Sequence, residues 1–336
     1  MKRKYLVPLM ITTLVATTAA GCSSSNSEDA GSQSSNTEKK AQEVRIAFLS
    51  EPDTLDPSLA TSEESFNMIN MYSEGLYRMD KDNKPQPAMA ADFPQISADG
   101  KKYTIKLRDG IKWSDGTPVT AKDFEYSWKR TTDPNTKSEY AFMFTMWIKG
   151  AEAYNGSKGK AEDMAVKAVD DKTLEFELNY PVAFFTSQLA FPLFFPEHKE
   201  FVEKQGDKKF AADADKMLAN GPFVLKNWTH DQSLEFVKND QYWDAANVKL
   251  DKATYQIVAD SNTALNLYES GDMDIIEITR DQVPQWKEKP DYSVSSRLFT
   301  YDLRFNEKNP AFKNAKIRQA LTMAIDRQTF VDTVLG

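Results

Sequence analysis

Cysteine and histidine are scarce in this sequence, and their scarcity limits the chemistry that the chain can perform. Cys22 is the single cysteine, and His198 and His230 are the two histidines among 336 residues. One thiol cannot build a disulfide framework or a thiolate metal site within the chain. The two histidines also lack the HExxH spacing of zinc hydrolases. We therefore expect no metal and no cofactor, and a fold that is stabilised by a hydrophobic core.

Other familiar catalytic motifs are also missing. No GxSxG nucleophile elbow occurs. Gly159-Lys160 fails as a phosphate-binding loop, because Tyr154 stands where a glycine is needed and Ala161 where Ser or Thr is needed. Three pairs of neighbouring carboxylates could in principle act as the catalytic acids of a glycosidase. They are Glu63-Glu64, Asp170-Asp171, and Asp272 with Asp274. Charged residues lie mostly at solvated surfaces, however, so exposed turn carboxylates are the commoner interpretation. These absences favour a protein that is not an enzyme and does not itself bind ATP.

The apolar stretch at the N-terminus is too short to cross a membrane. It follows a basic cluster at residues 2–4, runs from residue 5 to 15, and is interrupted by Pro8. A spanning helix needs about 20 apolar residues. A basic start, a short apolar core and small residues are typical of a secretory signal, so we predict that residues 1–21 are a signal peptide.

Small residues lead directly to Cys22, in an arrangement that resembles the bacterial lipobox, although Ala19 stands where leucine is more usual. In such signals the cysteine becomes the diacylated mature N-terminus, and two acyl chains suffice for stable membrane attachment. The alternative is a free thiol near a discarded end. Residues 23–40 carry no large apolar side chain and cannot form a core. We therefore predict that residues 22–42 are a lipidated cysteine followed by a disordered tether.

Positive charge is in the minority, with 42 lysines and arginines against 50 aspartates and glutamates. Removal of the basic signal peptide would increase this acidic excess. The balance argues against nucleic-acid binding and suits a protein that must stay soluble outside the cell.

Hydrophobic periodicity predicts a mixture of strands and helices. Alternating apolar residues predict strands around 44–48, 103–107, 111–113, 174–178, 223–225, 234–236 and 255–257. Helical spacing predicts helices around 66–76, 120–131, 261–270, 317–325 and 327–335. Thr120 with Asp123 forms a capping-box pattern, and Ser261 is the expected cap of its helix. The mixture predicts an α/β or α+β body.

Aromatic residues are plentiful, and aromatic walls are one means of holding an extended polar ligand without chemistry. Tyr140, Phe142, Phe144 and Trp147 cluster in the sequence, whereas Tyr72, Tyr77, Trp113 and Tyr301 are scattered. For any single one of them, a place in the core is the commoner role.

The longest recognisable segment is YTIKLRDGIKWSDGTPVTAKDFEYSWKRTTDP, from Tyr103 to Pro134, which resembles the signature of the family 5 extracellular solute-binding proteins. Further segments of that family follow in order and at similar spacing; they are EPDTLDP (51–57), NGPFVLKNW (220–228), SGDMDI (270–275) and FNEKNPAFKNAKIRQALTMAIDRQ (305–328). The resemblance covers the chain from about Val44 to its end. Within the family, KWSDGTPVTAKDF, SWKR and DPNT are similar to the oligopeptide-binding branch, and dipeptide, nickel, haem and sugar binders are related.

The resemblance implies a two-lobed α/β fold of the type II periplasmic-binding-protein kind. Residues 43–299 would form the first lobe, with a small extra domain at about 75–190, and residues 300–336 the incomplete start of the second lobe. It also implies a monomeric lipoprotein on the outer face of the cytoplasmic membrane, in the periplasm if two membranes are present. Such a protein delivers peptides to the permease subunits of an ABC transporter that has a separate ATPase.

The resemblance further implies ligand-binding residues in two regions. Thr61, Ser62, Glu63 and Glu64 match a loop that lines the ligand in peptide-binding relatives, and Tyr140 and Tyr301 follow matched motifs. Backbone hydrogen bonds would hold the peptide as an added strand, and hydrated pockets would accept varied side chains. A peptide pheromone receptor of the same fold and a surface hydrolase are the alternatives.

Overall fold

The structure is a computed structural model that describes residues 41–206, 209–295 and 302–335. The predicted signal peptide, Cys22 and Tyr301 lie outside the described residues. Within these ranges, no helix combines the length and the apolar character that a membrane crossing requires.

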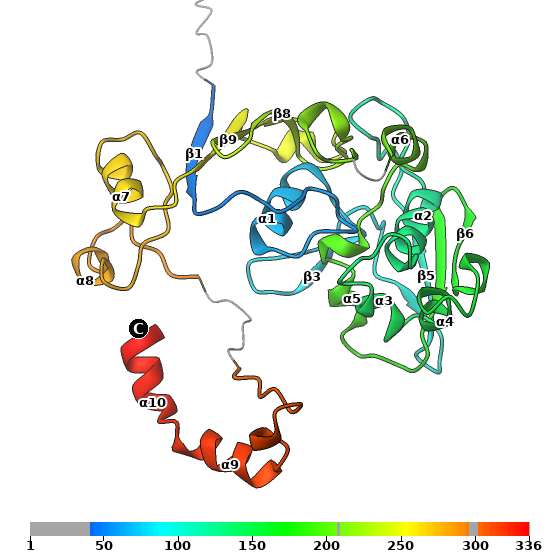
Figure 1. Cartoon of the computed structure of the whole chain (residues 1–336). Helices are drawn as coiled ribbons and strands as arrows, with labels where there is room; N and C mark the ends of the chain where they lie inside the picture. The colour runs from blue at the N-terminus through cyan, green and yellow to red at the C-terminus, as the bar shows by residue number, and fades with distance from the viewer. Residues whose placement is uncertain (1–40, 207–208, 296–301, 336) are drawn as a thin grey trace, which may run out of the picture. The chain divides into compact units, whose positions relative to one another are not determined.

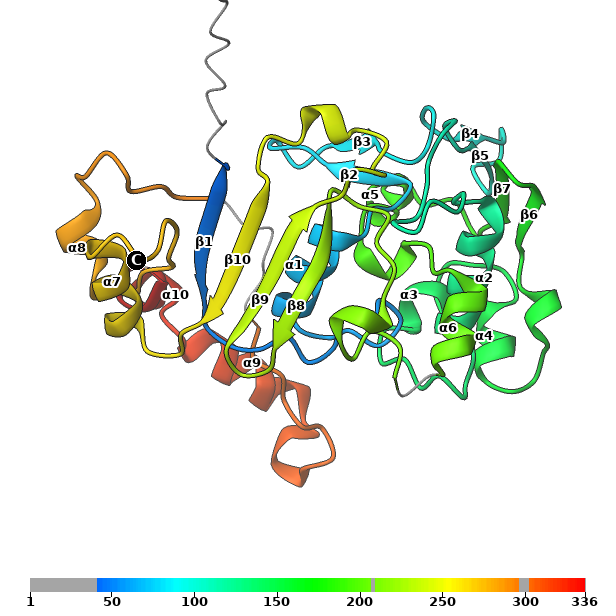
Figure 2. The ribbon, with the colours of Figure 1, turned by 90° about the horizontal axis from the view of Figure 1, so that it is seen from above.

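One sheet is built from strands at the two ends of the folded region. Strand β1 (Glu43–Phe48) pairs in parallel with β10 (Lys252–Ile257), which pairs in antiparallel fashion with β9 (Ser233–Lys238). Strand β8 (Phe223–Thr229) completes the order β1-β10-β9-β8 (Figure 2). The strands predicted at 44–48, 223–225, 234–236 and 255–257 are confirmed, and in β9 the alternate residues Leu234 and Phe236 are buried.

A second sheet has the strand order β4-β5-β7-β6. Its strands are β4 (Gln95–Ile96), β5 (Lys102–Lys106), β6 (Val166–Asp170) and β7 (Thr173–Glu177), and a separate hairpin pairs β2 (Tyr77–Met79) with β3 (Pro85–Pro87). Helix α2 (Ala121–Thr132) packs on this sheet, and the Trp128 ring lies 5.2 Å from the Phe176 ring. The predicted strands at 103–107 and 174–178 and the helix that starts after Thr120 are confirmed.

Helix α1 (Glu63–Tyr72) packs on the first sheet, and shorter helices connect the strands (Figure 1). The other α-helices are α3 (Phe142–Thr145), α4 (Ala151–Asn155), α5 (Phe185–Gln188), α6 (Lys199–Gln205), α7 (Ser261–Glu269), α8 (Val283–Trp286), α9 (Ala315–Ala324) and α10 (Arg327–Phe330). Short 3-10 helices span Ala161–Asp163, Pro192–Phe194, Ala214–Lys216, Ala245–Asn247 and Pro310–Phe312, and Val331–Leu335 is a π-helix.

The buried apolar side chains form two main clusters that divide by sequence. One contains residues from Leu76 to Phe194 and surrounds the sheet that α2 covers. The other combines Leu55–Tyr72 with Phe195–Ala253 and lies around the β1-β10-β9-β8 sheet. From Ala41 onward the chain nevertheless counts as one compact unit, so the domain limits expected from the sequence stay a prediction.

Three local expectations were wrong. Helix α1 ends at Ser73, and residues 74–76 do not continue it. Residues 111–113 form no regular strand, but an isolated antiparallel bridge pairs Lys112 with Pro118. The turn between them is tight, since the Gly116 N–H donates to the Trp113 carbonyl at 2.9 Å and Gly116 has φ +90°. Helix α7 is capped by Asp260, whose carboxylate accepts from the Thr263 N–H at 2.8 Å, because a carboxylate there also meets the helix dipole favourably.

The segment 302–335 contains the predicted helices α9 and α10, each capped by a side chain at its start. Asn314 accepts from the Lys316 N–H at 2.9 Å, and Asp326 accepts from the Thr329 N–H at 3.0 Å. The predicted apolar stripe of α9 is exposed among the described residues, with 43% of Ile317 accessible to solvent.

Candidate functional site

The segment after β1 carries three carboxylates, and each one contacts a different part of the chain. Glu51 is the first, and its Oε1 accepts from the Trp228 Nε1–H at 2.7 Å and lies 2.7 Å from His230 Nδ1. Its Oε2 accepts from the Asp231 N–H at 2.8 Å. Partial burial raises the pKa of Glu51, but these hydrogen bonds outweigh it and hold the pKa below its usual value. Glu51 thus ties the segment to the turn between β8 and β9.

Asp53, the second carboxylate, accepts hydrogen bonds from the loop that precedes α1. The hydroxyls of Thr61 and Ser62 donate to it at 2.6 and 2.8 Å, and the Ser65 hydroxyl donates to it as well. The Thr54 N–H adds a bond of 3.0 Å. Partial burial raises the pKa of Asp53, but the bonds from Ser65, Thr61 and Ser62 outweigh it and lower the pKa. Asp53 therefore closes the 53–65 segment on itself.

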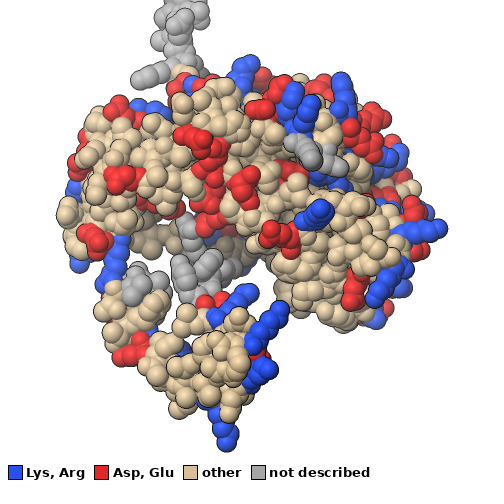
Figure 3. All heavy atoms as spheres, viewed as in Figure 1, with Lys and Arg blue, Asp and Glu red and all other residues tan. Residues whose placement is uncertain are grey.

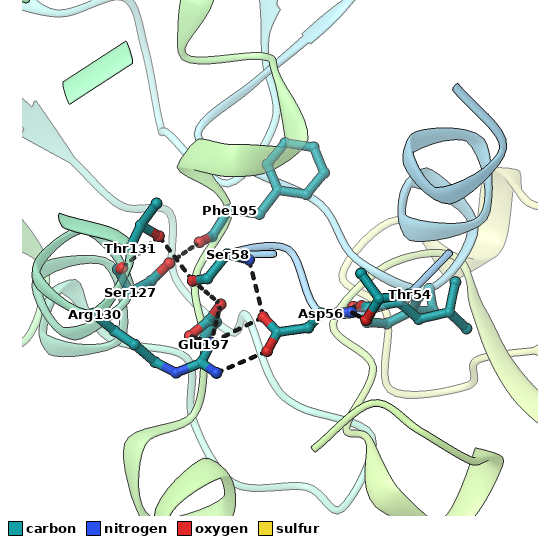
Figure 4. A network of polar contacts seen from close by, with 10 residues as sticks. Thr54, Asp56, Ser58, Ser127, Arg130, Thr131, Phe195 and Glu197 are labelled. Atoms are coloured by element: carbon teal, nitrogen blue, oxygen red, sulfur yellow. Dashed lines mark hydrogen bonds and ion pairs between the residues drawn. The ribbon is translucent and has the colours of Figure 1, made fainter. Parts of the chain in front are cut away.

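Asp56, the third carboxylate, forms a buried bidentate ion pair with Arg130 of α2 (Figure 4). The Arg130 Nη1 also lies 3.0 Å from Oε2 of Glu197, which is buried in the segment before α6. Figure 4 shows the three side chains pointing toward one another from these separate parts of the chain. The cluster therefore joins the segment after β1 to both hydrophobic clusters.

Hydroxyl groups complete this buried network. The Ser58 hydroxyl donates to Glu197 Oε1 at 2.7 Å and lies 2.8 Å from the Thr131 hydroxyl. Burial raises the pKa of Glu197 to about 7, although the charge of Arg130 lowers it, and the nearby negative charge of Asp56 raises it further. One cation cannot neutralise two buried carboxylates, which is why Glu197 retains its proton more readily than an exposed glutamate.

A pocket of about 390 Å³ lies at the carboxyl end of β1, beside the N-terminus of α1. Its lining includes Phe48, Leu49, Glu63, Glu64, Asn67, Tyr255, Ile275 and Glu277. Figure 3 shows acidic side chains gathered on the face where β1 and α1 lie in Figure 1. Ligands of α/β proteins commonly bind at the carboxyl ends of strands. The pocket combines apolar walls with carboxylates, a composition that suits a ligand with a positive charge.

The predicted ligand residues lie mostly around α1. Ser62 caps the helix by accepting from the Ser65 N–H at 3.2 Å, and Glu64 accepts from the Ser50 hydroxyl at 3.1 Å. The Tyr140 ring lies 5.7 Å from the ring of Phe66, which belongs to α1. The structure thus brings Tyr140 to α1, whose first turn contains Glu63 and Glu64, so only Thr61 and Ser62 of the expected loop precede the helix. Tyr301 lies outside the described residues.

Several aromatic candidates belong to the core instead. Tyr72, Tyr77, Trp113 and Phe144 are each at most 2% exposed. Tyr140 is only partly buried and also lies near Phe142 and Phe191, with ring centroids 5.5 and 6.2 Å away. This partial burial separates Tyr140 from the core aromatics.

The residues that hold the segment in place carry no clear structural signal in the sequence. Asp53 and Asp56 stand out only as part of the EPDTLDP segment, and nothing singles out Glu197. A signal existed for Arg130, because it follows the inward-facing Ser127 by three residues on an amphipathic helix. A cation on that buried face requires buried anions as partners.

Comparison with known proteins identifies the family. Residues 84–336 match the bacterial extracellular solute-binding proteins, family 5. The chain belongs to this family. It is 39% identical to the oligopeptide-binding protein OppA of Bacillus subtilis, over 99% of this chain and 61% of that protein. It is 38% identical to the dipeptide-binding protein DppE of the same organism, over 94% of this chain and 57% of that protein.

A solved structure extends this family 5 likeness to the fold. The structure of the pheromone receptor PrgZ, described with its mode of peptide binding, matches with a TM-score of 0.80 and 35% identity, over 87% of this chain and 58% of that one. The mixed α/β fold and the family expected from the sequence are thereby confirmed. The chain spans about three fifths of the length of these relatives. The family binds solutes and is not one of enzymes, in agreement with the sequence analysis.

Proposed function

We propose that this chain belongs to a lipid-anchored protein that captures oligopeptides outside the cell and delivers them to an ABC permease. The observation that carries the proposal is the segment 51–65. Three carboxylates fix it beside a pocket at the carboxyl end of β1, with the partly buried Tyr140 near the same helix. A rigid loop, an aromatic ring and a pocket with carboxylates suit the capture of an extended, polar ligand.

In the proposed mechanism the peptide lies along the loop at 61–64 and against Tyr140, with Tyr301 as a further contact. Carboxylates of Glu63 and Glu64 favour an ammonium group or a basic side chain in the adjoining pocket. Residues 43–299 form the first lobe with the small domain at about 75–190, and the second lobe begins near residue 300. Closure of the two lobes removes the peptide from bulk water, and no bond of the peptide is broken.

Delivery in this proposal depends on attachment and partners. Acyl chains on Cys22 hold the protein at the outer face of the cytoplasmic membrane, and residues 23–42 act as the tether. Permease subunits receive the peptide, and a separate ATPase supplies the energy. The bound protein acts as a monomer.

Two other ligands within the family are the main alternatives. The identities to OppA, DppE and PrgZ lie between 35% and 39%, so they do not separate oligopeptide transport, dipeptide transport and pheromone sensing. We favour oligopeptides because the KWSDGTPVTAKDF, SWKR and DPNT segments resemble that branch. Nickel and haem remain further alternatives.

Mass spectrometry of ligands released from the protein, purified from its own host and then denatured, tests the proposal. We expect a heterogeneous mixture of peptides several residues long. A single peptide sequence would indicate a pheromone receptor, dipeptides alone would indicate dipeptide transport, and haem or nickel would indicate another branch. Release of no peptide, together with no heat on titration with tri-, tetra- and penta-alanine, would refute peptide capture.

A further inference from the structure

We propose that Asp53 is a positioning residue that sets the conformation of the peptide-contacting loop before any ligand arrives. The inference rests on the proposed function, since it assigns a role within that binding site. Asp53 acts through the loop and not by touching the peptide.

The geometry places one carboxylate at the centre of the loop. Asp53 Oδ2 accepts from the Thr61 hydroxyl at 2.6 Å and from the Thr61 N–H at 3.3 Å. Its Oδ1 accepts from the hydroxyls of Ser62 and Ser65, and from the Thr54 N–H at 3.0 Å. The same carboxylate thus binds the start of the segment, its end and the first turn of α1, so the intervening residues 55–60 are closed into a fixed loop.

This arrangement limits the hydrogen-bond donors that the side chains of residues 61 and 62 can present to a peptide. A hydroxyl has one proton to donate. The Thr61 proton is directed at Asp53, and the Ser62 proton is directed at Asp53 or at the Ser65 hydroxyl, 3.0 Å away, which itself donates to Asp53. The loop can therefore meet a ligand through its backbone groups and through the carboxylates of Glu63 and Glu64. Backbone contacts do not depend on the ligand's side chains, which suits a binder of varied peptides.

The energetic benefit comes from order in the free protein. Fixing a residue's backbone costs conformational entropy, and when the loop is already fixed in the free protein, ligand binding does not have to supply that free energy. Glu51 and Asp56 hold the start of the segment to other elements, whereas Asp53 alone of the three binds residues 61 and 62. Loss of Asp53 should therefore loosen the ligand end of the loop and leave its attachment to the fold intact.

The test compares Asp53→Ala with Thr61→Val and with the double variant, each made in the protein expressed in its own host. Titration calorimetry with tri-, tetra- and penta-alanine measures Kd, and thermal denaturation measures Tm. We expect each single variant to raise Kd about tenfold with Tm within a few degrees of the parent. Because Asp53→Ala already removes the hydroxyl contact that Thr61→Val removes, the double variant should match Asp53→Ala, at about a tenfold rise. Thr61→Ser keeps the hydroxyl and should restore the parental Kd.

Asp80→Ala is the matched control. Asp80 also organises a turn, by accepting from the N–H groups of Asp82 and Lys84 at 2.9 Å, but this turn joins β2 to β3. We expect no change in Kd. An unchanged Kd in Asp53→Ala, or a hundredfold rise in the double variant, would overturn the inference, since the latter means that Thr61 contacts the peptide independently.

Amide hydrogen exchange tests the role of Asp53 without any peptide, and so independently of the proposed function. In the ligand-free protein, we expect residues 61–65 to exchange about tenfold faster in Asp53→Ala, with β8 and β9 unchanged. If the parent binds none of the peptides, peptide capture fails, and the exchange rates still decide whether Asp53 positions the loop. Equal rates in parent and variant would overturn the positioning role.

Discussion

Arg130 and Asp56 form a bidentate ion pair, with Nη1 2.9 Å from Oδ1 and Nη2 2.7 Å from Oδ2, between residues 74 positions apart in the sequence. Both side chains are buried, and the same guanidinium also contacts Glu197. The pair fixes the loop before the proposed ligand residues to α2. Since buried charges are costly without partners, the three residues depend on one another.

Arg130→Met should therefore destabilise the protein strongly. Removal of the cation leaves two buried carboxylates facing each other, and we expect a loss of about 3–5 kcal/mol in the free energy of unfolding, measured by urea denaturation. Lys122→Met is the control, because Lys122 lies on the same helix in an exposed pair with Asp171 at 2.7 Å. That change should cost much less than Arg130→Met, because an exposed ion pair in water contributes little to stability. A similar loss of unfolding free energy in both variants would show that the buried ion pair stabilises the protein no more than the exposed one.

Stability should fall as the pH rises from about 5 to 7, through Glu197. Burial raises its pKa to about 7 in the folded protein from 4.5, so in this window the folded state keeps a proton that the unfolded state has released. The stability that this proton provides is present below pH 4.5 and lost by the time the pH exceeds 7. Glu197→Gln should remove a fall on the order of 3 kcal/mol between pH 4.5 and 8, measured by urea denaturation. Parallel pH curves for parent and variant would contradict this.

Gly150→Ala should destabilise the protein more than Gly116→Ala. Both glycines have positive φ, +83° and +90°, a conformation that costs an L-residue about 1–2 kcal/mol. A Cβ at Gly150 would also lie 2.2 Å from the Asp163 carbonyl oxygen, whereas a Cβ at Gly116 would meet nothing within 4 Å. Thermal denaturation should show the larger drop in Tm for Gly150→Ala. Equal drops in Tm would mean that the backbone near Asp163 can move to accommodate the added Cβ without further loss of stability.

Tyr140→Ala should weaken peptide binding about tenfold, because the ring is partly exposed beside α1 and is proposed to contact the ligand. Titration calorimetry on protein from its own host measures the change. Tyr140→Phe keeps the ring and should retain most of the affinity. Phe93→Ala is a control, since Phe93 is another exposed aromatic residue, 51% exposed and stacked on Tyr77, and is not proposed to contact the ligand. A loss in the Phe93 variant as large as that in Tyr140→Ala would argue against a specific role for Tyr140.

Cys22→Ala should release the protein from the membrane without changing its fold. The acyl chains of the proposed anchor require the thiol, so the variant should be recovered in the soluble fraction after cell fractionation. Ser23→Ala leaves the thiol in place and should remain with the membrane. A Cys22→Ala protein that lacks the signal peptide and still sediments with membranes would rule out this anchor.

The strands and the family could be predicted from the sequence, because both depend on local order. Alternation around Tyr103, Leu174 and Leu234 reflects one buried face of each strand, and it needs no knowledge of which strands pair. The five family segments likewise need only their order along the chain. The ligand contacts proposed at residues 61–64 were inferred in this way, by a match to relatives, and stay a prediction.

Only the tertiary structure decided which carboxylates hold that loop and where α1 ends. Glu197 reaches Arg130 from 67 positions away, and no local pattern distinguishes it from an exposed glutamate. Helix α1 ends in the C-cap Ser73, whose backbone is extended, and the N–H groups of Asn220 and Gly221 donate to the Tyr72 carbonyl at 3.0 and 2.9 Å. Their partner lies almost 150 residues earlier in the chain. Such contacts form only when distant segments meet in the folded core, so the periodicity of residues 66–76 could not reveal them.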